Sequence, residues 1–242
     1  MQAIKTVNLT KRYKEVIAVD NLNLTVEQGE LFSLLGVNGA GKTTTIKMLS
    51  CLTSPTSGNA YLLNNSIISN QTAVKSIIAI SPQETAIAGG LSVQENLDLM
   101  CGLYGFSKDK KKEKIASLTK QLGLSEVINR KSGKLSGGYK RRLSIAMALI
   151  SEPKILFLDE PTLGLDVIAR SELWDLIREL KGKITIILTT HYLEEAEALS
   201  DRIAIMKDGK LLVCDTAQNI KTIANTDNFE QAFINVIKGA TK

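Results

Sequence analysis

Five continuous apolar runs, separated by helical patterns, constrain the fold of this chain more than any other feature of its sequence. A run without polar alternation suits a parallel strand, because helices cover such a strand on both faces. The sequence therefore predicts an α/β fold with a mainly parallel sheet. The expected strands are Leu31–Leu35, Ile77–Ile80, Ile155–Leu158, Ile184–Leu188 and Arg202–Met206.

Two other patterns flank and interrupt these runs. The N-terminal residues alternate apolar and polar positions, as in AIKTVNL and NLNLTVEQGE, which predicts an antiparallel β subdomain. Between Pro82 and Glu152 no strand pattern occurs, and this stretch is predicted to be an inserted helical subdomain. Its expected helices are Ser92–Leu103, which opens on the capping box SVQE, Lys108–Leu122 and Ser136–Ile150.

These patterns predict one folded unit. The 242 residues suffice for one substantial core, and 44% hydrophobic with 23% charged residues is an ordinary globular composition. We expect a single domain over residues 1–242, with a core lobe formed by 1–82 and 152–215 and a helical lobe formed by 83–151. A short strand, GKLLVC, leads into a weakly amphipathic C-terminal tail over 216–242.

Composition also bears on the compartment in which the chain works. No apolar stretch approaches the roughly 18–20 residues that span a bilayer, and the N-terminus lacks a signal-peptide core. Cys51, Cys101 and Cys214 are widely spaced in apolar surroundings, which favours buried thiols in a reducing compartment over disulfides or a metal site. We therefore expect a cytoplasmic protein without a membrane span of its own.

The formal net charge of +5 comes largely from one segment. KDKKKEK at 108–114 carries five lysines and two acids, and the rest of the chain is nearly balanced. Such a run is typical of a solvated helix face, although a surface that meets acidic headgroups or a partner fits it too. The charge therefore does not call for a nucleic-acid partner.

The segment GVNGAGKT at 36–43 matches G-x-x-x-x-G-K-[ST] between an expected strand and an expected helix. Gly36, Gly39 and Gly41 let the backbone curl so that successive N–H groups face phosphate oxygens. Lys42 supplies a positive charge to the outer phosphates, and the Thr43 hydroxyl suits Mg²⁺. The sequence therefore predicts a phosphate-binding loop here.

Polar side chains also follow three other expected strands. ILFLDEP at 155–161 places Asp159 and Glu160 at the carboxyl end of a strand, where ligands of open α/β sheets bind. Asp159 suits the Mg²⁺ shell, and Glu160 is placed to orient or deprotonate an attacking water. His191, the only histidine, and Gln83 each follow another strand. We expect both at the same edge, with His191 near the γ-phosphate and Gln83 as a neutral oxygen donor.

A second anion site is predicted at the start of a later helix. LSGGYKRR at 135–142 places Ser136, Gly137 and Gly138 where backbone N–H groups and the helix dipole face outward. This segment lies far along the chain from Lys42, so one chain carries two phosphate-binding elements.

Together these residues resemble the nucleotide-binding subunit of an ABC transporter over roughly residues 2–215, with the motifs in the family's order. The resemblance implies that 36–44 is the Walker A loop, ILFLDE the Walker B strand, LSGGYKRR the signature and LGLD, through Asp166, the D-loop of the dimer interface. It makes Gln83 the Q-loop glutamine, His191 the switch histidine, and Glu160 and His191 the catalytic residues. The implied ATP-binding residues are Tyr13, which would stack on adenine, Gly36, Asn38, Gly39, Ala40, Gly41, Lys42, Thr43 and Thr44, and the implied Mg²⁺ ligands are Thr43, Gln83 and, through water, Asp159.

Members of this family close as head-to-tail dimers, in which each ATP lies between the Walker A loop of one subunit and the signature of the other. On that pattern Ser136, Gly137 and Gly138 contact the partner's ATP, which accounts for the second anion site. Two positions depart from the common motifs. Tyr139 stands where glutamine is common, and Leu163 stands where a small polar residue is frequent in the D-loop, which leaves the detail of the dimer interface open.

The resemblance implies a subunit that binds and hydrolyses ATP with Mg²⁺ and powers separate transmembrane permease subunits, which hold it at the inner face of the cell membrane. Its motifs look most like the prokaryotic branch that exports drugs, polysaccharides, sodium or other small solutes. The second ATP-binding subunit is either identical or different. A non-transport ABC ATPase that acts on ribosomes or nucleic acid is the alternative, although such proteins resemble two fused domains or carry long inserted coiled coils. A nucleotide-binding regulator without hydrolysis ranks last, because Glu160 and His191 are both present.

Overall fold

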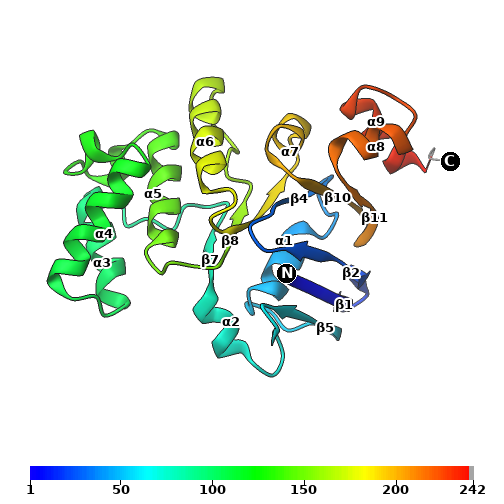
Figure 1. The fold of residues 1–242 in the computed structure, drawn as a ribbon, viewed down its shortest axis with the longest axis horizontal. Helices are drawn as coiled ribbons and strands as arrows, with labels where there is room; N and C mark the ends of the chain where they lie inside the picture. Colours follow the sequence, from blue (N-terminus) through cyan, green and yellow to red (C-terminus); the bar gives the residue numbers. More distant parts are fainter. Residues whose placement is uncertain (240–242) are drawn as a thin grey trace.

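A six-stranded sheet forms the centre of the molecule (Figure 1), whose computed structural model describes residues 1–239. In spatial order its strands are β11 (Lys210–Asp215), β10 (Arg202–Lys207), β4 (Leu31–Gly36), β9 (Thr185–Thr190), β8 (Ile155–Asp159) and β7 (Ile78–Ser81). The strands from β10 to β7 are all parallel, and β11 adds an antiparallel edge. The predicted α/β class with a mainly parallel sheet is therefore confirmed.

The central strands β4, β8 and β9 are buried throughout, because each face of the sheet packs into a different hydrophobic core. Along β8, Leu156 and Leu158 pack into a core that they share with the helices of the stretch 93–180. Ile155 and Phe157 pack instead into a core shared with the antiparallel sheet and helix α1 (Lys42–Leu49). Side chains alternate along a strand, so Asp159 continues the second set and lies on the α1 side of the sheet.

A separate antiparallel sheet packs on the α1 side of this central sheet, as the N-terminal alternation predicts. Its strands are β1 (Gln2–Tyr13), β2 (Val16–Leu22), β3 (Thr25–Glu27), β5 (Ser57–Leu62) and β6 (Asn65–Ser66). They lie in the order β2, β1, β5, β6, and β3 also pairs with β1. The sequence does not single out β5 and β6, because only Ala60 and Leu62 mark the buried face of β5.

Three helices form one end of the molecule, at the left of Figure 1, and they are the helices that the sequence predicts. They are α3 (Val93–Leu103), α4 (Lys108–Gln121) and α5 (Gly137–Leu149), with short 3-10 turns η1 (Ser125–Val127) and η2 (Ser132–Lys134) between the last two. No strand forms within residues 82–152, all of which the structure describes. The predicted capping box is present: the Glu95 N–H donates to Ser92 Oγ at 3.1 Å, and the Ser92 N–H donates to Glu95 Oε2 at 2.6 Å.

The remaining helices connect strands or follow the sheet. They are α2 (Gln71–Ile77), α6 (Val167–Leu180), α7 (Leu193–Leu199), α8 (Ala217–Ile223) and α9 (Phe229–Lys238). The last two lie at the end of the molecule opposite α3 and α4 (Figure 1). None of the helices formed by residues 1–239 is both long enough and apolar enough to cross a membrane.

The C-terminal tail packs more firmly than its predicted weak amphipathicity suggests. Phe229, Ala232 and Val236 of α9 are buried, and they share a third hydrophobic core with Ile203 and Ile205 of β10. Their spacing puts all three on one stripe of the helix, so the prediction of a weakly amphipathic tail is wrong for α9. The tail therefore covers the β10 side of the central sheet.

The cysteines differ from one another in burial. All three thiols are free, as predicted, but only Cys101 is buried, whereas Cys51 and Cys214 are half-buried. The prediction of buried thiols is therefore wrong for two of the three, because Cys214 stands on the edge strand β11 and Cys51 follows the end of α1. Partial burial still raises the pKa of Cys214 to about 11.

Candidate functional site

A cleft of about 820 Å³ opens at the carboxyl end of the central sheet. It is lined by the loop that follows β4 and by the polar residues that follow β7, β8 and β9, which is where open α/β sheets bind their ligands. The structure thus brings together most of the residues that the sequence predicts. The lining residues are Tyr13, Val16, Ile17, Ala18, Asn38, Gly39, Ala40, Gly41, Lys42, Thr43, Thr44, Gln83, Glu160, Leu163, His191 and Asp208.

The loop between β4 and α1 has a backbone that only glycine fits at one position. Gly41 is the N-cap of α1 and has φ +101°, which is in the left-handed region. A Cβ atom there would also lie 2.4 Å from the Ala18 carbonyl oxygen. No side chain caps α1, and the first N–H groups of a helix have no acceptor within it. This end of α1 therefore presents backbone donors beside the cleft, where an anion is stabilised.

Lys42 lies within this loop and is only 5% exposed. Its Nζ donates to the carbonyl oxygens of Gly36 at 2.7 Å and Val37 at 3.3 Å. Burial lowers the pKa of Lys42, and the charges of Glu160 and Asp159 partly oppose that shift. The ammonium group is thus held at the base of the cleft beside both acids.

Thr189, which the sequence analysis does not single out, organises the two acids. Asp159 pairs with Thr189 in the parallel register of β8 and β9, and the Thr189 hydroxyl donates to the Asp159 carboxylate. The Glu160 N–H in turn donates to the Thr189 hydroxyl and carbonyl oxygens, at 3.1 Å and 3.0 Å. One threonine therefore orients the carboxylate of Asp159 and fixes the backbone of Glu160.

Glu160 has a left-handed backbone, with φ +47°, and this conformation is uncommon for a residue with a side chain. Its carboxylate is 13% exposed, and Oε2 lies 3.1 Å from His191 Nδ1. The two atoms approach closely without hydrogen-bond geometry, and Nδ1 has no hydrogen-bond partner among residues 1–239. Strained residues persist where neighbours over-determine them, and here the two bonds to Thr189 do so.

The predicted second anion site lies apart from this cleft. Ser136 is exposed at the start of α5, where its side chain accepts from the Tyr139 N–H at 3.5 Å. Gly137 and Gly138 follow it, and a Cβ atom on Gly138 would lie 3.1 Å from the Ala169 side chain, so the start of α5 packs against α6. None of these three residues lines the cleft.

Asp166 also lies outside the cleft. It is the exposed N-cap of α6, and its carboxylate accepts from the Ala169 N–H at 2.9 Å. The start of α6 and the start of α5 are therefore neighbours, and neither lines the cleft.

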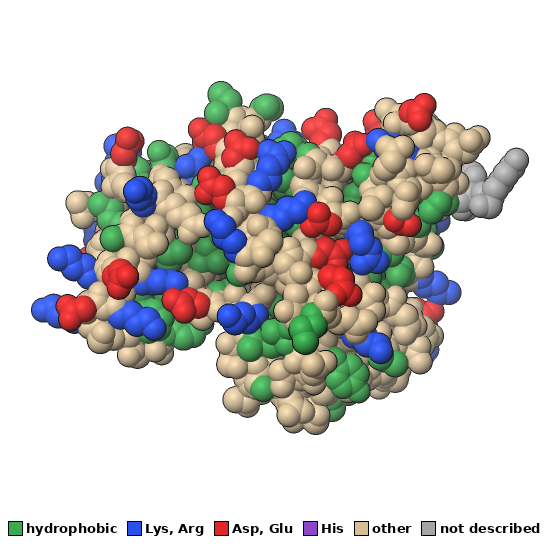
Figure 2. Space-filling model, in the orientation of Figure 1, with side chains coloured by type: hydrophobic (Ala, Val, Ile, Leu, Met, Phe, Trp, Pro, Cys, Tyr) green, Lys and Arg blue, Asp and Glu red, His purple; other side chains and the backbone are tan. Residues whose placement is uncertain are grey.

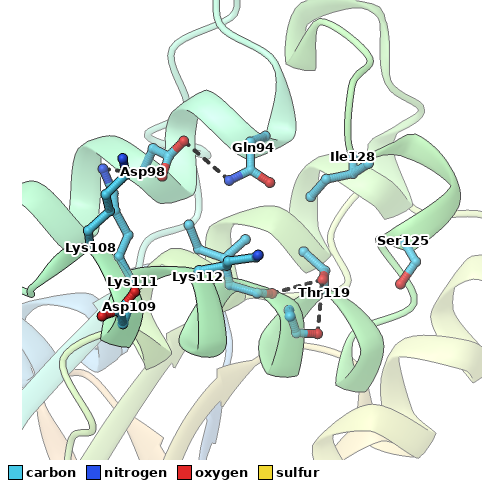
Figure 3. A pocket seen from close by; sticks show the side chains of 11 residues that line it. Gln94, Asp98, Lys108, Asp109, Lys111, Lys112, Thr119, Ser125 and Ile128 are labelled. Atoms are coloured by element: carbon cyan, nitrogen blue, oxygen red, sulfur yellow. Dashed lines mark hydrogen bonds and ion pairs between the residues drawn. The ribbon is translucent and has the colours of Figure 1, made fainter.

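The lysine-rich segment lines a different hollow, of about 730 Å³, between α3 and α4 (Figure 3). Lys108, Lys111 and Lys112 lie at i, i+3 and i+4 on α4, facing Gln94 and Asp98 of α3. Lys111 pairs with Asp98 at 3.2 Å, so this carboxylate offsets one of the three positive charges. Figure 2 shows basic side chains interleaved with acidic ones over this end of the molecule.

The prediction of a solvated lysine face holds for part of that segment. Lys108, Lys110 and Lys112 are exposed. It is wrong for Lys111 and Lys114, which are half-buried. Each forms an ion pair with an acidic residue of another segment, Lys111 with Asp98 and Lys114 with Glu152.

Comparison with known proteins places this site in context. A family model described as ABC transporter matches residues 19–163. The chain is 40% identical over 222 residues to the daunorubicin/doxorubicin resistance ATP-binding protein DrrA of Streptomyces peucetius, covering 91% of this chain and 67% of that protein. It is 41% identical over 222 residues to the human phospholipid-transporting ATPase ABCA3, covering 90% of this chain but 13% of that protein. The chain thus spans only a part of the curated relatives that it matches.

Solved structures share the fold over most of its length. A structure described as the ATP-binding subunit of an ABC transporter superposes with a TM-score of 0.85 at 26% identity, covering 97% of this chain and 99% of that one. A dimeric bacterial ABC transporter cassette superposes with a TM-score of 0.79 at 29% identity, covering 88% of this chain and 98% of that one.

Proposed function

The chain belongs to the ABC transporter family, and on that premise we propose that it is the ATP-binding and ATP-hydrolysing subunit of a transporter, which its motifs indicate is an exporter. One observation carries this proposal: a single cleft gathers Tyr13, Lys42, Gln83, Glu160 and His191 from five separate segments of the chain. Each of these side chains has a different use in phosphoryl transfer to water, and no other hollow of the described residues combines them.

The phosphate groups are held by the loop and the start of α1. The backbone N–H groups of the stretch 36–44 surround the phosphates, and Lys42 adds a charge that its burial makes effective, because the surrounding dielectric is low. Tyr13 also lines the cleft, half exposed at the end of β1, and is suited to stack on the adenine ring.

The residues beside Lys42 fit a magnesium ion. Thr43 and Gln83 line the cleft and offer a hydroxyl and an amide oxygen, and the buried Asp159 carboxylate is oriented by Thr189. Mg²⁺ prefers one or two protein oxygens with water and phosphate rather than a cage of side chains, so this donor set suits it. When bound, the ion neutralises charge that develops on the phosphates.

Hydrolysis needs a water that is oriented and relieved of a proton, and Glu160 is the group placed to do this. Its carboxylate lies in the cleft lining 3.1 Å from His191 Nδ1. His191 thereby restricts where the carboxylate can point, and its other ring nitrogen is available to donate toward the γ-phosphate. The two bonds from the Glu160 N–H to Thr189 keep the pair in place.

The signature at Ser136–Gly138 serves a second copy of such a subunit, identical or not. It is exposed at Ser136 and does not line the cleft of its own chain, which supports an ATP site completed across a head-to-tail dimer. Asp166 lies beside it and belongs to the same dimer surface. Both lobes of the proposed single domain then approach the partner together. They are the core lobe, residues 1–82 and 152–215, and the helical lobe, residues 83–151.

A groove of about 370 Å³ between β7, α3 and α5 offers a place for the permease subunits. Its lining is mainly apolar, and two of its side chains, Leu52 and Tyr104, are largely exposed. It also includes Pro82, which precedes Gln83, so a membrane-spanning chain docked there touches the loop that reaches the nucleotide. The protein would then sit on the cytoplasmic side of the membrane through its partners.

The proposal is tested with the purified chain and with its partners in the cell. The chain is expected to hydrolyse ATP only when Mg²⁺ is present. Affinity purification from solubilised membranes is expected to recover a membrane-spanning subunit. Absence of hydrolysis by the full complex would contradict the enzyme assignment, and recovery of ribosomes or nucleic acid instead of membrane protein would contradict the transport assignment.

A further inference from the structure

Arg141 is a buried arginine that the proposed chemistry does not use. It lies on α5, five residues after Ser136, and is only 4% exposed. Its guanidinium Nη1 donates to the Pro82 carbonyl at 2.6 Å, and Nη2 donates to the Gln83 carbonyl at 2.7 Å. A single side chain of the signature helix thus holds the two peptide groups that flank the Cα atom of Gln83.

Burying this guanidinium is costly, because its two hydrogen-bond acceptors among residues 1–239 are neutral carbonyls. Burial lowers the pKa of Arg141, and the charges of Asp159 and Glu195 only partly oppose that shift. What this burial provides is two short charge-assisted hydrogen bonds to one loop, which fix the geometry of that loop.

The residue whose position these bonds define is Gln83. The side chain of this residue is exposed and lines the nucleotide cleft, while its backbone carbonyl is the atom that Arg141 holds. The loop from 82 to 91 has no regular secondary structure. Without Arg141, the segment that carries the Gln83 amide would have fewer tertiary hydrogen bonds to define its path.

A second contact, between α5 and the end of β7, has a different effect. Ser81 Oγ and Ser144 Oγ are 2.9 Å apart and buried, one turn along α5 from Arg141. This bond ties α5 to the end of β7, whereas Arg141 ties α5 to the loop beyond that strand. The serine pair therefore secures the helix without holding Gln83.

We infer that Arg141 is a positioning residue: it fixes the backbone of Gln83 so that the amide faces the nucleotide, and it ties that amide to the helix that begins at Ser136. A rigid helix carries a displacement along its axis, and Arg141 lies about 7.5 Å from Ser136 at 1.5 Å per residue. A change at the signature therefore reaches the Gln83 of the same chain. This inference rests on the proposed function, because it assigns Gln83 a role in hydrolysis.

The test compares Arg141→Met with Arg141→Lys and with the matched junction variant Ser144→Ala. We expect Arg141→Met to lower kcat by roughly 10- to 100-fold, as small misplacements of a catalytic group do, with the Kd for ATP within about threefold of wild type. Arg141→Lys keeps a charged donor and should recover part of kcat. Ser144→Ala should lower thermal stability while kcat stays within about twofold of wild type.

Amide hydrogen exchange over residues 84–88 supplies a readout that does not need hydrolysis. We expect faster exchange in Arg141→Met than in wild type, and no change in Ser144→Ala. Unchanged exchange in Arg141→Met would overturn the inference, as would a kcat within twofold of wild type or equal losses in Arg141→Met and Ser144→Ala. If Arg141→Met does not fold, the same comparison between Arg141→Lys and wild type decides. A wild-type protein that fails to hydrolyse ATP contradicts the proposed function, whereas the exchange result still tests the Arg141 contact.

Discussion

The start of α1 and the start of α5 are both helix N-termini suited to an anion, but they differ in what surrounds them. At α1, Gly41 leaves the first N–H groups without a side-chain cap, and Lys42, Glu160 and His191 of the same chain converge on the cleft. At α5, Ser136 caps its own helix, and its neighbours are α6 and solvent. On the proposed function, the first is a complete site and the second is half of a site that a partner completes.

The largest expected effect concerns the chemical step at the complete site. Glu160→Gln keeps the size of the side chain but removes the base, so we expect kcat to fall by roughly 10²- to 10⁴-fold while ATP binding is spared. Turnover and ATP affinity are to be measured on the same preparation. Near-normal hydrolysis would mean that another group orients the water and that the cleft is not organised around Glu160.

Lys42→Ala tests the phosphate contact of the same site. Loss of a charge-assisted hydrogen bond to phosphate costs about 1.5–3 kcal/mol, which raises the Kd for ATP by roughly 10- to 150-fold. Titration with a fluorescent ATP analogue measures this. An unchanged Kd would contradict this account, because it would show that the start of α1 does not bind phosphate through Lys42.

A smaller effect is expected at a buried contact between α7 and α6, the helix that neighbours the start of α5. Glu195 of α7 is fully buried, and its Oε1 accepts from Trp174 Nε1 of α6 at 3.0 Å. Burial raises the pKa of Glu195, opposed in part by the hydroxyls of Thr190 and Thr162, by Trp174 and by the charge of Arg170.

The folded state therefore binds a proton that the unfolded state releases once the pH exceeds the ordinary glutamic acid value. The free energy of unfolding should fall as pH rises from that value through the raised pKa, and Glu195→Gln should remove this fall, an effect on the order of 1 kcal/mol. The free energy of unfolding can be measured by denaturant titration at several pH values, followed by the fluorescence of Trp174, the only tryptophan of the chain. A wild-type stability that does not fall more steeply with pH than that of the variant would contradict the assignment.

The residues that the cleft gathers can be recognised in the sequence because their patterns are local. A strand followed by a glycine-rich loop, or by two carboxylates, can be recognised within about ten residues, and the parallel order of the strands brings their ends to one edge. The elements of the lobe formed by α3, α4 and α5 are equally predictable, because Ser92 and Glu95 mark a helix start by themselves.

The supporting residues could not be predicted in this way. Thr189 acts on Asp159 only because β9 pairs with β8 in a particular register, and Arg141 acts on Gln83 only because α5 packs beside the end of β7. Such contacts depend on tertiary packing, and a single sequence contains no local pattern for them.

The smallest expected effect on a separated chain belongs to Ser136→Arg, because Ser136 lies outside the cleft that binds its own ATP. We expect the Kd for ATP of that variant to stay within about twofold of wild type. The same change should nevertheless abolish the dimer, because an arginine at the start of α5 obstructs the approach of the partner's γ-phosphate.

Light scattering of Glu160→Gln protein with MgATP, with and without Ser136→Arg, tests this most directly. The single variant should shift from monomer to dimer, since ATP that is not hydrolysed holds two pairs of phosphate-binding loop and signature together, and the double variant should remain monomeric with normal ATP affinity. A double variant that still dimerises, or a Ser136→Arg chain that loses ATP affinity as severely as Lys42→Ala does, would show that the signature does not act on a partner's nucleotide.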